Sequence, residues 1–412
     1  MSEIESRDRR LVPDIPYREM EQSIDVSHIA HPESDELLTI NFGPHHPATH
    51  GVLRLITTLE AEVVRDIKPV IGYVHTGIEK TAEDKAYWKA IPVVERMDYL
   101  AYYFNAMAFC GAVETILDLE VPPRAQYLRV IHMELNRIMS HLVWLGTTAL
   151  DLGAISMFWY CFRDREQILD LFEMSSGQRM HTRYFQVGGV FEDIPVGWEK
   201  KVRTFTDIMP DRVDQFLALL MKNEIALQRL RNVAPLDQQT LLDHGVTGPL
   251  LRAVGNPWDL RKAAPYSSYD HFDFRIPVGT TGDNWDRMIV RIIEQALDGL
   301  PEGPYITTNR KYALPPRHEL ATSMEALIHH FKLVTEGFRV PPGEVYYPVE
   351  SPRGELGCFV RSDGSSKPAR VHMRDPSFVN LQAFKPMVQD LYIADLIATL
   401  AMLDPILGGI DR

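Results

Sequence analysis

The spacing of hydrophobic and polar positions changes twice along the chain. Between residues 37 and 75, apolar positions alternate with polar ones in short runs, which predicts strands over Leu37–Phe42 and Val52–Leu59. From about Thr81 to Arg231, apolar positions recur three and four residues apart, which predicts helices. Beyond residue 233 the pattern is mixed, and we expect both helices and strands there.

The clearest helical pattern covers Tyr127–Leu145. Its apolar stripe, with spacings of three and four residues, consists of Leu128, Ile131, Leu135, Ile138, Leu142 and Leu145. Two prolines precede the stripe and a glycine follows it, which suits the two ends of a helix. Glu134, Arg137 and His141 form a polar line beside the stripe, and we interpret Glu134 and Arg137 as a structural pair.

The same periodicities predict the remaining elements. Further helices are expected over Met97–Ile116, Arg165–Ser175, Arg212–Leu230, Asn284–Leu297 and Ser323–Val334. Strands are expected over Val345–Val349, Leu356–Ser362 and Lys367–Arg374, with a hairpin turn at Asp363 and Gly364 and a strand-rich loop over Tyr266–Pro277.

Several long helices without β–α–β alternation favour a helical bundle. We therefore predict an α+β fold: a central helical bundle with a small N-terminal antiparallel β region and a C-terminal β-hairpin region. The predicted division is a flexible N-terminal arm over 1–36, a β region over 37–80, the bundle over 81–232 and a mixed α/β region over 233–412. The arm is charged and interrupted by proline, which is typical of segments that order on a partner.

A histidine-rich turn, Gly43–Leu55, joins the first two predicted strands. It contains His45, His46 and His50, and its two prolines exclude a regular helix. Histidines on a turn held by strands suit proton or ligand chemistry, but they could equally satisfy backbone groups of the turn. His46 and His50 have the spacing of a metal pair on a helix, yet the proline between them argues against that helix, and the spacing fixes no third ligand.

Composition narrows the classes of function. Of 412 residues, 43 are Lys or Arg and 56 are Asp or Glu, and the net charge of -13 argues against nucleic acid as the main partner. Cys110, Cys161 and Cys358 are far apart and form no Cys-x-x-Cys pair, so neither a disulfide framework nor a cysteine metal site is predicted. We find no secretory signal, no apolar run long enough to span a bilayer, and no phosphate loop or dinucleotide-binding glycine motif.

Several stretches of sequence, in a fixed order, resemble one family. They are Asn41–Gly51, His75–Lys80, Arg96–Tyr99, Ser323–Lys332, Glu350–Gly357 and the Asp404–Pro405 tail. They closely resemble the D-type, or 49-kDa-type, subunit of proton-pumping NADH:quinone oxidoreductase, known as respiratory complex I. The resemblance extends from about residue 37 to the C-terminus. It implies a fold similar to the large subunit of nickel–iron hydrogenases.

Those hydrogenases hold their metals with two Cys-x-x-Cys pairs. The early pair corresponds to Asp98 and Ala101 in this chain, and the late pair to Ile406 and Gly409. Because thiolates are the soft ligands that such a centre needs, the resemblance implies that this chain binds no metal or cluster. It also implies that the former metal cavity is available to a quinone headgroup, and it argues against a working hydrogenase.

The resemblance assigns the headgroup site to three residues. His50 and Tyr99 match the family's headgroup ligands, and Asp151 matches the carboxylate that pairs with the histidine. Quinone reduction consumes two electrons and two protons. Histidine, with a reference pKa of ~6.5, suits the role of proton donor, and tyrosine can donate a hydrogen bond without ionising beforehand.

Five further residues match functional positions of the family. Arg96 and His181 match residues beside the terminal iron–sulfur cluster of a partner, where they would tune its potential, and ordinary interface hydrogen bonds are the alternative. His141, Arg353 and Asp404 match a polar relay toward a membrane subunit, and a buried ion-pair network without a transport role is the alternative.

The resemblance also implies partners and a location. The expected partners are quinone, the terminal iron–sulfur cluster subunit, the 30-kDa-type subunit, the ferredoxin-like cluster subunit and the quinone-channel membrane subunit. The expected location is peripheral, on the cytoplasmic side of the inner membrane. Two interpretations remain: a quinone-reducing catalytic subunit, and a metal-free scaffold that only assembles cluster subunits. His50, Tyr99 and Asp151 together favour the first, because a scaffold has no need of all three.

Overall fold

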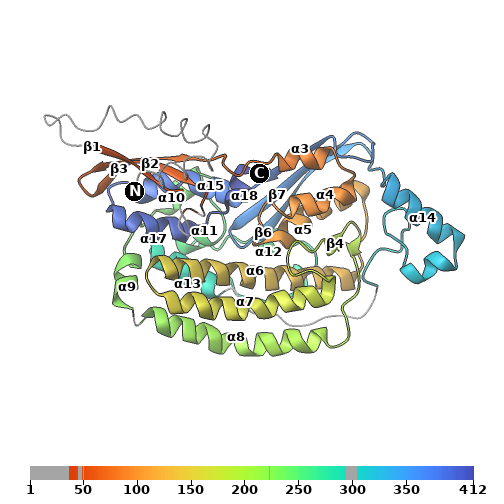
Figure 1. The fold of residues 1–412 in the computed structure, drawn as a ribbon, viewed down its shortest axis with the longest axis horizontal. Helices are drawn as coiled ribbons and strands as arrows, with labels where there is room; N and C mark the ends of the chain where they lie inside the picture. Colours follow the sequence, from red (N-terminus) through yellow and green to blue (C-terminus); the bar gives the residue numbers. More distant parts are fainter. Residues whose placement is uncertain (1–36, 45–48, 50, 222, 294–303) are drawn as a thin grey trace, which may run out of the picture.

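The computed structural model of the chain describes residues 37–44, 49, 51–221, 223–293 and 304–412. The predicted N-terminal arm, residues 1–36, lies outside this part, as do the three histidines of the histidine-rich turn. In the described part, small antiparallel sheets flank a set of long helices, which confirms the predicted α+β class (Figure 1).

The N-terminal sheet has three antiparallel strands in sequence order. These are β1 (Leu37–Phe42), β2 (Arg54–Glu60) and β3 (Val63–Val70). Buried and partly exposed residues alternate along β2, so that Leu55, Thr57 and Leu59 point into the protein. This alternation is the period-two pattern from which the strand was predicted. The buried face packs against helices from the C-terminal part of the chain.

Long helices form the largest layer of the molecule. They are α5 (Tyr102–Leu117), α6 (Pro123–Asp151), α7 (Ile155–Ser176) and α8 (Trp198–Met221). In Figure 1, α6, α7 and α8 run side by side across the lower half of the molecule. Every residue of α5 from Tyr102 to Glu114 is buried, because this helix is apolar on nearly all sides and lies at the centre of the core.

A C-terminal sheet packs on the other side of α5. It consists of β6 (Gly343–Ser351), β7 (Gly354–Ser362) and β8 (Arg370–Arg374), in that order and antiparallel. The tight turn between β6 and β7 is Pro352-Arg353, where Ser351 pairs with Gly354. The connection between β7 and β8 is longer than a hairpin turn of Asp363 and Gly364 alone, because pairing ends at Arg361 and Arg370.

Shorter elements complete the fold. They are α3 (Ile78–Glu83), α4 (Tyr87–Val94), β4 (Phe185–Gln186), β5 (Gly189–Val190), α9 (Glu224–Leu230), α10 (Gln238–Asp243), α11 (Pro249–Ala253), α12 (Leu260–Ala263), η2 (Tyr269–His271), α13 (Asn284–Ile293), η3 (Arg317–Ala321), α14 (Met324–Thr335), α15 (Pro376–Gln382), α16 (Phe384–Val388), α17 (Ile393–Leu403) and α18 (Leu407–Asp411). None of the helices in the described ranges is both long and apolar enough to cross a membrane.

Several predicted elements differ from the structure, among them the helix predicted over Arg165–Ser175, which begins at Ile155 as α7. The single helix predicted over Arg212–Leu230 is divided between α8 and α9, and the Asn223 side chain caps α9. The strand-rich loop predicted over Tyr266–Pro277 contains the short helix η2 and no strand, because its aromatic side chains pack into the core instead of pairing in a sheet. The helix predicted from Met97 begins only at Tyr102.

Candidate functional site

The turn between α4 and α5 holds a group of polar side chains. Glu95 and Asp98 are buried there, and Tyr99 is half-buried. Oδ1 of Asp98 accepts hydrogen bonds from the backbone N–H groups of Leu100, at 3.1 Å, and Ala101, at 3.0 Å. These bonds satisfy buried backbone donors in the turn that precedes α5. Asp98 thereby fixes the turn that carries Tyr99, and α5 begins after this turn, at Tyr102.

Tyr99 lies against the C-terminal tail of the chain. A Cβ added at Gly408 of α18 would lie 3.3 Å from Cδ1 and Cε1 of Tyr99 and 2.5 Å from the carbonyl oxygen of Met97. A residue without a Cβ is therefore needed for this approach. Burial, followed by the carboxylate of Asp98, raises the pKa of Tyr99 to about 12, against the opposing effect of Arg353. The phenol keeps its proton at neutral pH and can donate a hydrogen bond.

Arg353 stands at the centre of a buried ion-pair cluster. It is fully buried in the turn between β6 and β7. Its Nη1 donates to Oδ2 of Asp98 at 2.9 Å, its Nη2 to Oδ1 of Asp404 at 3.1 Å, and its Nε to the backbone carbonyl of Asp404 at 2.9 Å. The structure thus brings together two of the three predicted relay residues. This contact fits both a relay and the alternative of a structural ion-pair network.

His141, the third predicted relay residue, is buried on α6 one turn beyond Arg137. Arg137 and Glu134 form an ion pair at 2.9 Å, which confirms the predicted structural pair. Nη2 of Arg137 also donates to the backbone carbonyl of Glu350 at 2.6 Å. Since Glu350 is close to Arg353 on the same hairpin, the polar line of α6 lies beside the segment that carries Arg353.

A second buried ionic network lies along this part of α6. Its three arginines and three carboxylates are Arg137, Arg252, Arg261, Glu134, Asp259 and Glu350. The closest pairs are Arg261–Asp259 at 2.7 Å and Arg252–Glu350 at 2.8 Å. Sequence reasoning missed Arg252, Asp259 and Arg261. They lie on or beside helices of four and five residues, α12 and α11, which are too short to show a periodicity.

Asp151, the predicted partner of His50, is the last residue of α6 and is half-buried. Burial raises the pKa of Asp151 to about 6. A carboxylate in such surroundings is stabilised in its charged form by a nearby cation. His50 lies outside the described residues, so the pair stays a prediction.

The positive charge of Arg96 acts electrostatically on the imidazole of His181. Arg96 is exposed, and its guanidinium donates to the carbonyl of Pro92. His181 adopts a left-handed backbone conformation with φ of 52°, and its ring centroid lies 5.3 Å from that of Tyr102. Burial lowers the pKa of His181, and the positive charge of Arg96 lowers it further. A neutral imidazole beside a guanidinium is therefore the favoured state.

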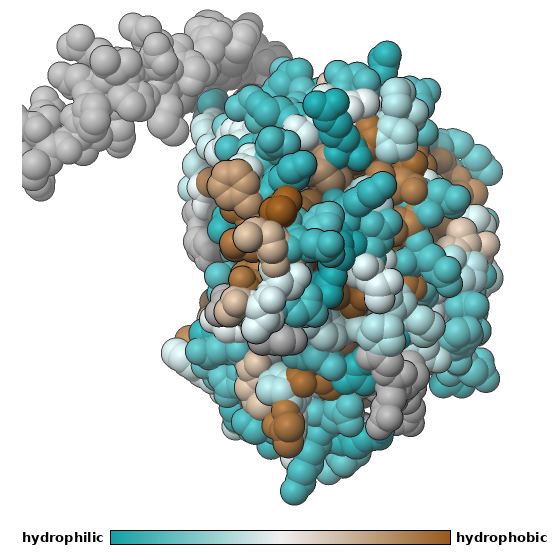
Figure 2. Space-filling view, turned by 90° about the vertical axis from the view of Figure 1, so that its right-hand side faces the viewer, coloured by the Kyte–Doolittle hydropathy of each residue, from teal (hydrophilic) through white to brown (hydrophobic). Residues whose placement is uncertain are grey.

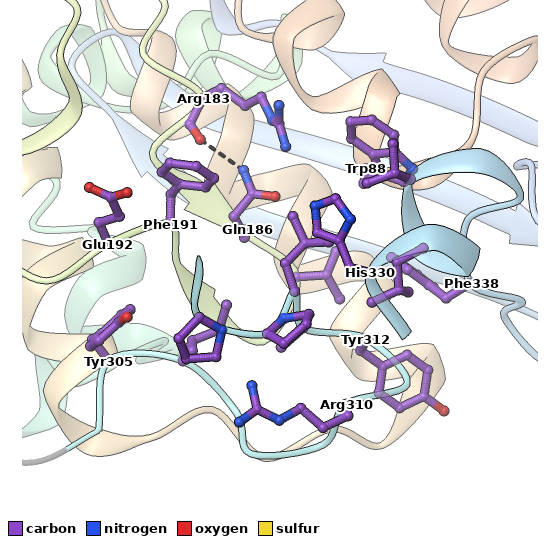
Figure 3. Close-up of a pocket in the computed structure, with 18 of the residues that line it drawn as sticks. Trp88, Arg183, Gln186, Phe191, Glu192, Tyr305, Arg310, Tyr312, His330 and Phe338 are labelled. Carbon is purple, nitrogen blue, oxygen red and sulfur yellow. Dashed lines mark hydrogen bonds between the residues drawn. The ribbon is translucent and has the colours of Figure 1, made fainter. Parts of the chain in front are cut away.

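A cavity of about 710 Å³ opens between β4, the segment of residues 191–193 that follows β5, α14 and the loop before η3 (Figure 3). Its walls are mostly aromatic and aliphatic, and the charged or titratable groups among them are Arg183, Arg310, His330, Glu192 and Asp193. The guanidinium of Arg183 lies 5.0 Å from the centroid of Trp88. No predicted site residue within the described ranges lines this cavity. The cavity is therefore separate from the group around Tyr99 and Arg353.

The helix α14, beside this cavity, presents apolar side chains to solvent. Met324, Leu327, Ile328 and Phe331 recur three and four residues apart and are all exposed, Met324 by 72% and Phe331 by 67%. Figure 2 looks onto this side of the molecule, where hydrophobic residues lie among hydrophilic ones. An exposed apolar stripe of this kind is typical of a surface that packs against another protein.

In the described part of the chain, no three His, Cys, Asp or Glu side chains are placed together so that they could hold a metal ion. At the positions that match the hydrogenase cysteines, Asp98 is paired with Arg353, and Gly409 lies against the carboxylate of Asp375. The side chains beside Asp98 and Gly409 are thus a guanidinium and a carboxylate, which suit ion pairs and hydrogen bonds.

Comparison with known proteins finds related sequences that match almost the whole chain. The profile of the family described as "Respiratory-chain NADH dehydrogenase, 49 Kd subunit" matches residues 151–412. The chain is 52% identical over 389 residues to the second D-type subunit of NADH-quinone oxidoreductase from Chloroflexus aurantiacus, and the match covers 92% of this chain and 95% of the relative. It is 48% identical over 388 residues to the D-type subunit of NADH-quinone oxidoreductase from Geotalea uraniireducens, and this match covers 92% of this chain and 100% of the relative. The chain therefore belongs to the family of the 49-kDa subunit of respiratory-chain NADH dehydrogenase.

Proposed function

We propose that this chain, as part of an assembled NADH:quinone oxidoreductase, binds the quinone headgroup and supports its reduction. The observation that carries the proposal is the position of Tyr99. Its protonated phenol lies on a turn fixed by Asp98, against the tail residue Gly408. That turn and that tail hold the positions that match the metal-binding cysteines of hydrogenases.

The chemistry of quinone reduction requires donors at both carbonyl oxygens, because two electrons and two protons convert a quinone to a quinol. Tyr99 would donate a hydrogen bond to one oxygen, and its raised pKa keeps the hydroxyl proton in place until the reduced oxygen is basic enough to take it. A charged His50 would give a proton to the other oxygen, with Asp151 stabilising the charged imidazole before transfer. After the transfer, Asp151 is left with an unbalanced negative charge.

The electrons would come from the terminal iron–sulfur cluster of a partner subunit. We assign the contact with that subunit to Arg96, which is exposed, and to His181, which is partly exposed and on which the charge of Arg96 acts. A guanidinium near a cluster favours its reduced form, since it offsets the added negative charge. The neutral imidazole of His181 would serve as a hydrogen-bond donor or acceptor rather than as a second charge.

Proton coupling would pass through His141, Arg353 and Asp404. The charges of Arg353 and Asp404 both act on the pKa of Tyr99, so a change of charge at the headgroup is felt by the ion-pair cluster. In this proposal the chain is peripheral on the cytoplasmic side of the inner membrane. The relay faces a membrane subunit, and the 30-kDa-type and ferredoxin-like subunits cover other surfaces.

The proposal is tested in assembled complexes with short-chain quinone as substrate. Tyr99→Phe removes one hydroxyl, so headgroup binding should weaken by about 0.5–1.5 kcal/mol, seen mainly as a raised KM. His50→Ala removes a donor and leaves Asp151 without its cation, so it should cost more. Tyr346→Phe is a matched control, because its hydroxyl donates to Glu355 at the exposed edge of the hairpin.

The alternative function, a scaffold for the cluster subunits, makes a different prediction. In that case Tyr99→Phe and His50→Ala leave both turnover and KM at the wild-type values while the complex still assembles. That result would refute the catalytic proposal.

A further inference from the structure

Three carboxylates and a single guanidinium meet at the base of the site. Asp98 and Asp404 are hydrogen-bonded to Arg353, and the charges of both, together with that of Asp375, act on Arg353. Asp375, Asp98 and Asp404 are 2%, 3% and 3% exposed, and Arg353 is fully buried. With all four groups ionised, the cluster would carry an excess of two negative charges away from water. Such an excess is unfavourable unless it is paired or neutralised by a proton.

The neighbouring ionic network provides a contrast. It contains three arginines and three carboxylates, so its charges balance without any proton. The excess of negative charge is thus a property of the Arg353 cluster and not of the buried ionic groups in general.

The three carboxylates of the cluster differ in their bonding. Asp98 uses one oxygen for two backbone N–H groups and the other for Arg353. Asp404 bonds Arg353 directly. Asp375 caps α15 through Oδ1, which accepts from the N–H groups of Ser377 at 2.8 Å and Phe378 at 3.3 Å. Asp375 is therefore the member of the cluster without a direct ion pair to Arg353.

The second oxygen of Asp375 is buried and receives no hydrogen bond from any described residue. A Cβ added at Gly409 would lie 2.1 Å from this Oδ2, so the oxygen is held against the backbone of α18. On the same short helix, Oγ of Ser377 and Oδ1 of Asn380 are also buried without a partner among the described residues. Nδ2 of Asn380 donates to the Arg353 carbonyl at 3.3 Å, so this face of α15 is turned toward the cluster.

We propose that Asp375 takes up and releases a proton as part of the Arg353 cluster, in which Asp98 and Asp404 form the ion pairs with Arg353. This assignment rests on the proposed function only in placing the cluster beside the headgroup site. The two glycines of α18 connect the two places: Gly408 lies against the ring of Tyr99, and Gly409 lies against the carboxylate of Asp375.

The pKa of Asp375 agrees with this geometry. Burial first, then the Asp98 carboxylate, raise it to about 6, while the cap hydrogen bond from Ser377 and the charge of Arg353 oppose the rise. The proton is thus held below about pH 6 and released above it.

Charged groups on the other elements around α15 are engaged elsewhere. Lys385 pairs with Asp66, Asp395 with Arg229, and Arg374 donates to the carbonyls of Glu355 and Gly245. On α18, the Asp411 carboxylate accepts from the N–H groups of Gly72 and Val74. Arg412 lies over the ring of Phe378 and pairs with Glu79. Among the described residues, Asp98 and Arg353 are therefore the charges that act on Asp375.

The test is infrared spectroscopy of assembled complexes. Spectra of the wild type and of Asp375→Asn are recorded separately over a pH range around 6 and then compared. The wild type should show a carboxylic-acid carbonyl band that disappears as the pH rises through this range, and Asp375→Asn should lack the band. The control is Asp237→Asn, which makes the same change at the exposed cap of α10 and should keep the band. A band of equal size in Asp375→Asn, or its absence from the wild type, would overturn the assignment.

Asn resembles the protonated form of Asp375 and also caps helices well, so Asp375→Asn should assemble normally. Asp375→Ser, which keeps the cap without an ionisable group, should assemble as well. If neither variant assembles, the site requires a permanent negative charge, and the assignment is wrong. The infrared band needs no quinone, so it can titrate even if Tyr99→Phe leaves KM unchanged; the two proposals therefore fail independently.

Discussion

Gly408 of the C-terminal tail lies so near the aromatic ring of Tyr99 that an added Cβ would be 3.3 Å from two ring carbons, although Tyr99 is more than three hundred positions earlier in the chain. The tail is also held from the other side, because Asp404 at its start is bonded to Arg353. The position of the phenol thus depends on where the last helix of the chain is seated.

This contact predicts the effect of Gly408→Ala. The new methyl group would lie 2.5 Å from the Met97 carbonyl oxygen, so α18 or the turn that carries Tyr99 must move. We expect a several-fold rise in KM for short-chain quinone with a smaller change in turnover, measured in assembled complexes. The control is Gly343→Ala, where a Cβ meets only Cγ2 of Ile116 at an ordinary 3.5 Å. An unchanged KM in Gly408→Ala would mean that Tyr99 does not contact the headgroup.

Replacing Arg353 tests how strongly the buried cluster depends on its one cation. Arg353→Gln leaves the carboxylates of Asp98 and Asp404 buried without the guanidinium, which should cost about 3–5 kcal/mol. We expect a large fall in the thermal stability of the subunit and in its abundance in assembled complexes.

The matched control is Arg65→Gln. Arg65 also bridges two carboxylates, Glu60 and Asp390, but on the surface, where water replaces the lost contacts. The thermal stability of the subunit should not change measurably in the Arg65→Gln variant. Equal effects of the two substitutions would show that burial of the Arg353 cluster is not what makes it important.

The sequence was sufficient to predict elements with a long, regular pattern. The stripe from Leu128 to Leu145 lies within α6, because a buried face repeats its apolar residues at the period of the helix. The strand Leu37–Phe42 also has the predicted bounds, although none of its residues is buried. The split between α8 and α9 was missed because the apolar spacing continues across it, while a capping asparagine at 223 begins a new helix. Local capping chemistry decided this boundary.

The ionic groups around the site could be predicted only in part. Arg353 and Asp404 were identified from a family resemblance, and no local spacing connects a hairpin turn with the end of α17. Asp375 precedes a proline at a helix start, so its capping role was open to prediction, but its burial was not. Burial of a polar residue depends on which distant segments pack over it, and for Asp375 that segment is α18.

Glu95 predicts a pH dependence of stability. It is fully buried, and burial raises its pKa from 4.5 to about 7 against the hydrogen bond from the Arg183 N–H group and the charge of Arg96. The folded chain therefore holds this proton more tightly than the unfolded chain. The resulting stabilisation is fully present below pH 4.5 and is lost as the pH rises through 7.

The corresponding experiment compares wild type with Glu95→Gln, which cannot ionise but keeps an acceptor for Arg183. Thermal unfolding of the subunit in assembled complexes should show the wild type losing stability relative to Glu95→Gln between these pH values. Glu199→Gln, at an exposed position of α8, should follow the wild type. Parallel curves for wild type and Glu95→Gln would contradict the raised pKa.

Asp404→Asn separates a relay from a headgroup ligand. The substitution keeps the shape of the side chain and removes its charge, while Arg353 keeps its bond to Asp98. If Asp404 takes part in proton coupling, turnover or proton translocation should fall while the KM for quinone stays near the wild-type value. A raised KM with normal turnover would instead place Asp404 in the headgroup site. Normal kinetics with reduced thermal stability would show that it serves only as a buried ion-pair partner.

The control is Asp395→Asn on α17, the helix that ends at Asp404. The Asp395 carboxylate pairs with Arg229 at 2.8 Å, and its substitution should change neither kinetic constant. The three outcomes can be told apart because each role of the Asp404 charge affects a different quantity. A role in the reaction changes turnover, a role in quinone binding changes KM, and a role in the fold changes thermal stability.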